Sequence, residues 1–206
     1  MNWMASFSDE LMKISEAQRV EEAFHHEVED VDGLKKKLKP GDVLFTAPLR
    51  SKMKGVVGRY LFKPLSKKIQ GTDYGHAALY VGDGEVVDTR LGQGTKKVTL
   101  EHVARTNQIV ALRPQVTPEE RKAAVEYAEG QVGVPYSMTH LVGSVSPVRP
   151  KHHKPDKAPE KHICSALVAS AYKDRKFTDV ATSVTRPNEL MQSRLLRPVA
   201  ALRKEH

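Results

Sequence analysis

Short apolar runs alternate with glycine- and proline-containing turns between Leu38 and Leu112, and one more run begins at Leu195. They predict strands in a segment within Leu38–Phe45 and then over Ala77–Val81, Glu85–Asp88, Lys97–Leu100, Ile109–Leu112 and Leu195–Ala200. The tight turn Gly82-Asp83-Gly84 joins two of these strands into a hairpin. The pattern therefore predicts a small antiparallel sheet.

Four other segments have apolar residues at helical spacing. An acidic amphipathic helix is expected over Ser8–Val28, because Ser8 can cap it and Asp9 and Glu10 suit its first turn. Further helices are expected from Thr117 to near Gly130, over Ser165–Tyr172 and within Thr185–Met191. The fold class expected is α+β, in which the sheet packs against helices.

The chain of 206 residues suits one domain with an accessory segment. We expect an N-terminal helical extension at residues 1–37 and a catalytic domain at residues 38–206. Within the domain, residues 138–162 are rich in proline, lysine and histidine and are expected to form a loop.

The net charge of +8 is unevenly distributed. The first 33 residues hold nine acidic and two basic residues, so the remainder is strongly basic and favours anionic partners. The stretch Arg50–Lys68 has seven basic and no acidic residues, interleaved with apolar ones, and is a candidate for contact with an anionic surface. The alternative is a helix with a solvated basic face. No motif for specific nucleic-acid binding is present.

The N-terminus lacks the apolar core of a signal peptide, and no apolar run approaches the ~20 residues of a membrane span. We therefore expect synthesis in the cytoplasm, with delivery elsewhere by a route without a cleavable signal left open. The oligomeric state is not predicted.

Cys164 is the single cysteine, which excludes an internal disulfide. It begins an apolar helix, where the helix dipole and unpaired backbone N–H groups lower the pKa of a thiol. A nucleophile of this kind needs a base, and His76 opens the first strand of the predicted hairpin. Asp88 lies at the far end of the second strand, roughly opposite His76, where a carboxylate can orient the imidazole. Glu85, Glu101 and His102 are alternatives to Asp88 if the register shifts.

Five segments together resemble the circularly permuted branch of the NlpC-type papain-like cysteine hydrolases, which includes the YiiX-like proteins and, more distantly, the lecithin retinol acyltransferase group. They are Lys39-Pro40-Gly41-Asp42-Val43, Gly75-His76-Ala77-Ala78-Leu79-Tyr80-Val81-Gly82, Gly133-Val134-Pro135-Tyr136-Ser137, Cys164-Ser165-Ala166-Leu167-Val168 and Arg186-Pro187-Asn188-Glu189-Leu190. Their order, with histidine before cysteine, is the mark of the permuted branch.

This resemblance implies a permuted papain-like fold with Cys164 as nucleophile, His76 as general base and then acid, and Asp88 as the polar third member. It also implies that Tyr136 lines the site, and we assign Tyr136 and Ser165 to oxyanion or substrate binding. Tyr136 as a core residue is the alternative. No cofactor is expected. The four histidines His140, His152, His153 and His162 suggest zinc, but their spacing does not suit tetrahedral coordination, so no metal is predicted.

The leading hypothesis is a hydrolase that cleaves an amide through a thioester, in a peptide or a peptidoglycan cross-bridge. The second hypothesis, based on the stretch Arg50–Lys68, is an acyl-lipid hydrolase or acyltransferase at anionic membranes. The third is a noncatalytic interaction module on the same fold, with the acidic N-terminal helix docking a partner.

Overall fold

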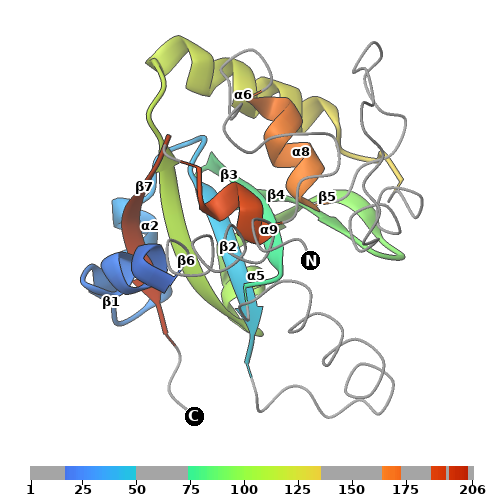
Figure 1. Ribbon diagram of the computed structural model, residues 1–206. Coiled ribbons are helices and arrows are strands. Elements are labelled where there is room, and N and C mark those ends of the chain that lie inside the picture. The colour runs from blue at the N-terminus through green and yellow to red at the C-terminus, as the bar shows by residue number, and fades with distance from the viewer. Residues whose placement is uncertain (1–16, 50–73, 136–163, 173–186, 194, 204–206) are drawn as a thin grey trace, which may run out of the picture.

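A seven-stranded sheet forms the centre of the computed structural model (Figure 1). The structure describes residues 17–49, 74–135, 164–172, 187–193 and 195–203. Residues 17–24 are helical. The elements that follow are β1 (Glu27–Val28), α2 (Val31–Lys37), β2 (Val43–Pro48), β3 (His76–Gly82), β4 (Glu85–Arg90), β5 (Gly94–Thr99), α5 (Leu100–Ala104), β6 (Asn107–Pro114), α6 (Pro118–Gly130), α8 (Cys164–Ala171), α9 (Pro187–Met191) and β7 (Leu196–Leu202).

The strand order in the sheet is β1-β7-β6-β2-β3-β4-β5. Neighbouring strands are antiparallel except for β1 and β7, which are parallel. The α+β class is confirmed, but the sheet is larger than predicted and is not wholly antiparallel. The reason is that β1 adds to the edge of β7, the last strand of the chain. The described part of the predicted extension, residues 17–37, thus contributes to the same sheet.

Helices cover both faces of the sheet, so the molecule has three layers (Figure 1). Along β2 the buried side chains alternate: Val43 and Phe45 join one apolar cluster, and Leu44 joins the other. The first cluster packs against α6, α8 and α9, and the second against α2 and α5. The helix that begins with Cys164 is therefore held on one face by core packing.

Two of the predicted boundaries are wrong. The N-terminal helix ends at residue 24 rather than Val28, because Val28 pairs with Leu202 in the sheet. The strand predicted over Lys97–Leu100 runs from Gly94 to Thr99, and Leu100 instead begins α5. The Thr99 side chain accepts a hydrogen bond from the backbone N–H of His102 and so caps this helix.

The helix expected from Thr117 is present as α6, and its N-terminus is built as the sequence predicts. The Thr117 hydroxyl accepts a hydrogen bond from the backbone N–H of Glu120, and the Glu120 carboxylate accepts one from the backbone N–H of Thr117. This capping box fixes the direction in which α6 leaves β6 and crosses the sheet. In the part of the chain that the structure describes, no helix has the length and apolar character needed to cross a bilayer.

The turn before β2 ties α8 and α6 to the sheet. Asp42 is fully buried and accepts hydrogen bonds from Arg113 at 2.7 and 2.8 Å and from Arg121 at 3.2 Å. The hydroxyl of Tyr172, just after α8, donates to the carbonyl of Gly41. These contacts hold the far end of the helix that Cys164 begins.

Replacing Gly41 with alanine is expected to destabilise the protein by at least about 2 kcal/mol. Gly41 has φ of 90°, a conformation that side chains disfavour, and an added Cβ would lie 2.4 Å from Cγ of Arg121 and 2.6 Å from the hydroxyl of Tyr172. Urea unfolding measures the change in free energy of unfolding. Gly130→Ala is the control, because a Cβ at Gly130 meets nothing within 4 Å. Equal stability of Gly41→Ala and the native protein would contradict the expectation.

Candidate active site

Cys164 is the first residue of α8 and is 8% exposed. The next turn of the helix buries Leu167 and Val168 in the first apolar cluster, which anchors the helix against β3. The thiol therefore lies at the positive end of a packed helix, beside backbone N–H groups that have no partner within the helix. This is the position that the apolar run after Cys164 predicts.

His76 is the first residue of β3, and Thr46 of β2 lies opposite it in the sheet. Its side chain hydrogen-bonds to the Cys164 side chain, and the backbone of the next residue, Ala77, hydrogen-bonds to the Cys164 sulfur. The start of β3 thus contacts the start of α8 twice. Because the His76 side chain is 24% exposed, solvent reaches the ring.

Asp88 completes a row of three hydrogen-bonded side chains. Nε2 of His76 donates to Oδ1 of Asp88 at 2.6 Å. This contact leaves the other ring nitrogen, Nδ1, for the interaction with Cys164. Asp88 is 3% exposed, so its carboxylate holds the ring with little competition from water.

The pairing of β3 with β4 explains how Asp88 reaches the ring. Leu79 lies opposite Val87 and Tyr80 opposite Val86, in the hairpin formed by the Gly82-Asp83-Gly84 turn. Continuing this register places Asp88 two positions from the residue opposite His76, a diagonal neighbour. The predicted hairpin, together with a register shift between Tyr80 and Gly82 that the sequence analysis did not predict, therefore brings the two side chains together.

The three side chains shift one another's pKa values. Burial acts to lower the pKa of His76, but the Cys164 thiolate and the Asp88 carboxylate outweigh it and raise this pKa to about 10. Burial acts to raise the pKa of Cys164, but the His76 cation and the Ala77 backbone outweigh it, so the net pKa of the thiol is lowered. Both directions favour a thiolate paired with an imidazolium at neutral pH.

Asp88 remains ionised in this environment. Burial acts to raise its pKa, but His76 first and Arg90 second lower it, to about 2. Nε of Arg90 donates to Oδ2 of Asp88 at 2.5 Å. The carboxylate is thus held between two cations, and Arg90 is a residue that the sequence analysis missed.

The alternatives to Asp88 have other contacts or positions. Glu85 accepts a hydrogen bond from Lys97 at 3.0 Å, and the ring of His102 accepts one from Arg105 at 3.3 Å. Glu101 is exposed on α5. Of the four candidates, Asp88 is the one that contacts His76.

Two other predicted site residues have different outcomes. Ser165 follows Cys164 in α8 and is completely buried. Tyr136 lies outside the described residues, as do the whole of the predicted 138–162 loop and the basic stretch Arg50–Lys68. The roles assigned to all of them stay predictions.

The histidines considered for zinc, His140, His152, His153 and His162, also lie outside the described residues. Over residues 17–49, 74–135, 164–172, 187–193 and 195–203, no three histidine, cysteine, aspartate or glutamate side chains form a group that could hold a metal ion.

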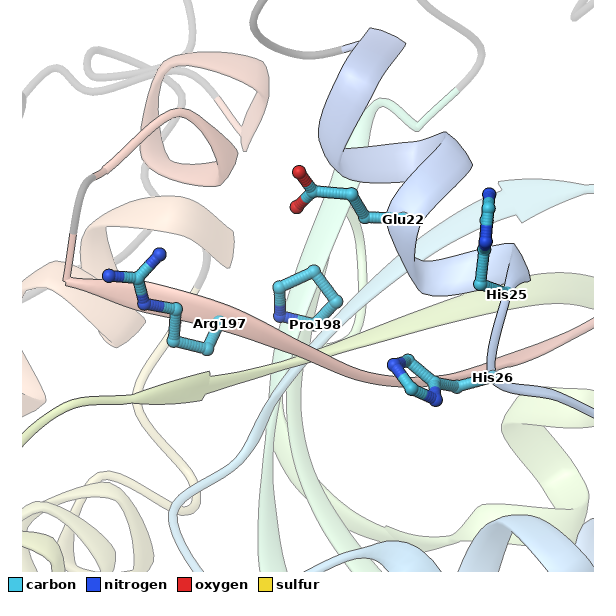
Figure 2. Close-up of a pocket in the computed structure, with 5 residues that line it drawn as sticks. All are labelled: Glu22, His25, His26, Arg197 and Pro198. Carbon is cyan, nitrogen blue, oxygen red and sulfur yellow. The ribbon is translucent and has the colours of Figure 1, made fainter.

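An open surface pocket lies elsewhere on the molecule (Figure 2). It is lined by Glu22, His25 and His26, which come from the N-terminal helix and the turn after it, and by Arg197 and Pro198 of β7. In the strand order, β6 and β2 separate β7 from β3. This pocket is therefore distinct from the Cys164 site.

Comparisons with known proteins show the family and the fold. Residues 37–194 match the model of a family described as permuted papain-like amidase enzymes, YaeF/YiiX, of the C92 family. The structure resembles the crystal structure of metalloprotein yiiX from Escherichia coli O157:H7, with 14% sequence identity and a TM-score of 0.55 over 80% of this chain and 97% of that one. No curated protein matches the chain.

Proposed function

Since the chain belongs to the C92 (YaeF/YiiX) family of permuted papain-like amidases, we propose that Cys164 is its nucleophile, His76 its general base and acid, and Asp88 the residue that orients the imidazole. The observation that carries the proposal is the row of hydrogen bonds from Cys164 through His76 to Asp88. The order of the residues fits a permuted enzyme, because the histidine precedes the cysteine in the chain.

The first half of the reaction forms a thioester. The Cys164 thiolate attacks the carbonyl carbon of the amide, and the oxygen becomes an oxyanion that backbone N–H groups at the start of α8 can stabilise. The His76 imidazolium then donates its proton to the nitrogen as the C–N bond breaks. The amine leaves, and the acyl group stays on Cys164.

The second half releases the acyl group. Neutral His76 takes a proton from water, and the resulting hydroxide attacks the thioester carbonyl. The C–S bond breaks, the carboxylic acid product leaves, and Cys164 returns as a thiolate paired with His76. Asp88 keeps one ring nitrogen of His76 occupied, so the other nitrogen faces Cys164 throughout.

We propose a peptide or a peptidoglycan cross-bridge as the substrate. The family's amidase chemistry supports an amide bond. The basic composition of the chain beyond its first 33 residues supports concentration on anionic cell-wall polymers. No metal ion takes part in any step of this proposal. The yiiX protein is described as a metalloprotein, and over the described residues of this chain no group of three or more histidine, cysteine, aspartate or glutamate side chains could hold a metal ion.

Amine release from defined substrates tests this proposal. The full chain is incubated with cross-linked peptidoglycan fragments, with short peptides, and with phosphatidylglycerol vesicles, and new primary amines and free fatty acids are measured. We expect new amines from the fragments or the peptides, and none when Cys164→Ala replaces the native protein.

Two outcomes would contradict it. Fatty acid release from the vesicles without amine release would favour the acyl-lipid hypothesis. No product from any substrate, together with an unreactive Cys164, would favour the noncatalytic module.

A further inference from the structure

Arg90 is the last residue of β4 and contacts the side chain that orients His76. Its Nε donates to Oδ2 of Asp88, while Oδ1 of the same carboxylate accepts from His76. The two carboxylate oxygens are thus divided between two cations. Because Asp88 and Arg90 are two residues apart in a strand, their side chains extend from the same face of the sheet.

The backbone at Arg90 is held on one side by the sheet. It lies opposite Gly94 in the pairing of β4 with β5. The intervening residue, Thr89, is buried, and its hydroxyl hydrogen-bonds to that of Thr95 at 2.9 Å. The Arg90 side chain, which is 33% exposed, therefore extends to Asp88 from a fixed strand end rather than from a loop.

Without Arg90, the negative charges of the site would exceed the positive ones. The Asp88 carboxylate supports the imidazolium, but the same negative charge acts to raise the pKa of Cys164 and so disfavours the thiolate. A thiolate and a carboxylate beside a single imidazolium leave one negative charge in excess. The guanidinium of Arg90 offsets it.

We propose that Arg90 is a positioning residue of this site, which holds the Asp88 carboxylate in the orientation that serves His76 and balances its charge beside the Cys164 thiolate. This inference rests on the proposed cysteine chemistry. It assigns Arg90 no contact with the reacting atoms, because its action passes through Asp88.

The other charged groups around Asp88 are few among the described residues. His76 faces it from β3 and Arg90 from β4, and Cys164 lies beyond His76 at the start of α8. On β5, Lys96 lies opposite Asp88 in the register but is exposed to solvent. Arg90 is therefore the one cation besides His76 that is hydrogen-bonded to the carboxylate within these residues.

The test is the rate of Cys164 alkylation by iodoacetamide as a function of pH, measured on the full chain. In Arg90→Gln we expect the midpoint of the thiolate titration to rise by about one pH unit, since the neighbouring negative charge is no longer offset. Below the midpoint, this shift slows alkylation about tenfold. Arg90→Lys keeps the charge without the planar donor group, so we expect a smaller shift of the midpoint but a several-fold loss of kcat/KM.

Arg197→Gln is the matched control, because Arg197 is an exposed arginine on β7, remote in the strand order. It should leave the midpoint unchanged. Thermal unfolding establishes which variants are folded. If Arg90→Gln is not folded, the inference is tested with Arg90→Lys alone. A native midpoint and native kcat/KM in the folded Arg90 variants would overturn the inference, as would a lowered midpoint in Arg90→Gln.

The same assay separates this inference from the proposed function. If the thiol titration of the native protein is ordinary and indifferent to His76→Ala, the proposed cysteine chemistry fails and the inference fails with it. If the titration depends on His76 but not on Arg90, only the inference fails.

Discussion

Replacing Cys164 with alanine is expected to abolish amide hydrolysis, with a loss of at least about 10⁴-fold in kcat. The thioester cannot form without the sulfur, and no other cysteine exists in the chain to replace it. The measurement is single-turnover amine release from the substrate that the native protein cleaves. The position is nearly buried at the start of a packed helix, and removing one sulfur there should leave the fold intact.

Cys164→Ser is the matched control for shape. A hydroxyl has a much higher pKa than a thiol, so His76 cannot hold it ionised, and we expect this variant to be inactive as well. Thermal unfolding of both variants should resemble that of the native protein. Activity within tenfold of native in either folded variant would show that Cys164 is not the nucleophile.

Replacing His76 with alanine is expected to lower kcat/KM by about 10²–10⁴-fold and to change its pH dependence. In the native protein, we expect activity to rise with pH as Cys164 ionises, at a pKa lowered from its ordinary value by the His76 cation. We expect it to fall again as His76 loses its proton, near the raised pKa of about 10, because the neutral ring would no longer protonate the leaving amine. The measurement is kcat/KM across this range.

In His76→Ala the rising limb should move to higher pH and the falling limb due to the imidazolium should vanish. His25→Ala is the control, since His25 lines the pocket of Figure 2 together with residues of β7. In the strand order, β7 is separated from β3. We expect it to keep the native profile. A native profile in His76→Ala would exclude this histidine as the base.

The contact between His76 and Asp88 could be predicted because it is local. Both residues lie on strands joined by a turn with positive φ at Gly82, Asp83 and Gly84, which makes them near neighbours in the sheet. The face on which Asp88 lies depends on a register shift between Tyr80 and Gly82, which the sequence does not show. The helix at Cys164 was also readable locally, since the run from Cys164 to Val168 is apolar apart from Ser165.

The boundaries that the sequence analysis placed wrongly depend on contacts that outweigh the local pattern. Val28 continues the polar and apolar pattern of a helix, yet it pairs with Leu202, more than 170 residues away. Leu100 suits the strand before it, but the Thr99 cap turns it into the start of α5. In both cases a tertiary or capping contact outweighs the local pattern.

Arg90 was missed although a signal for it existed. An arginine two residues after a candidate carboxylate on the same strand shares its face, and this spacing was available in the sequence. The contact of Cys164 with His76 is a different case. Eighty-eight positions separate them in the chain, and no periodicity joins them. The sequence analysis paired them because a nucleophile needs a base and His76 opens the predicted hairpin, and the resemblance to a permuted family then supported the pairing.

The most direct test of the account is the apparent pKa of Cys164, obtained from its rate of alkylation by iodoacetamide against pH in the native protein and in His76→Ala. The account predicts a value well below the ~8.5 of a free cysteine in the native protein and a rise when His76 is removed. An ordinary pKa that does not change with His76→Ala would contradict the coupling of nucleophile and base on which the proposed mechanism depends.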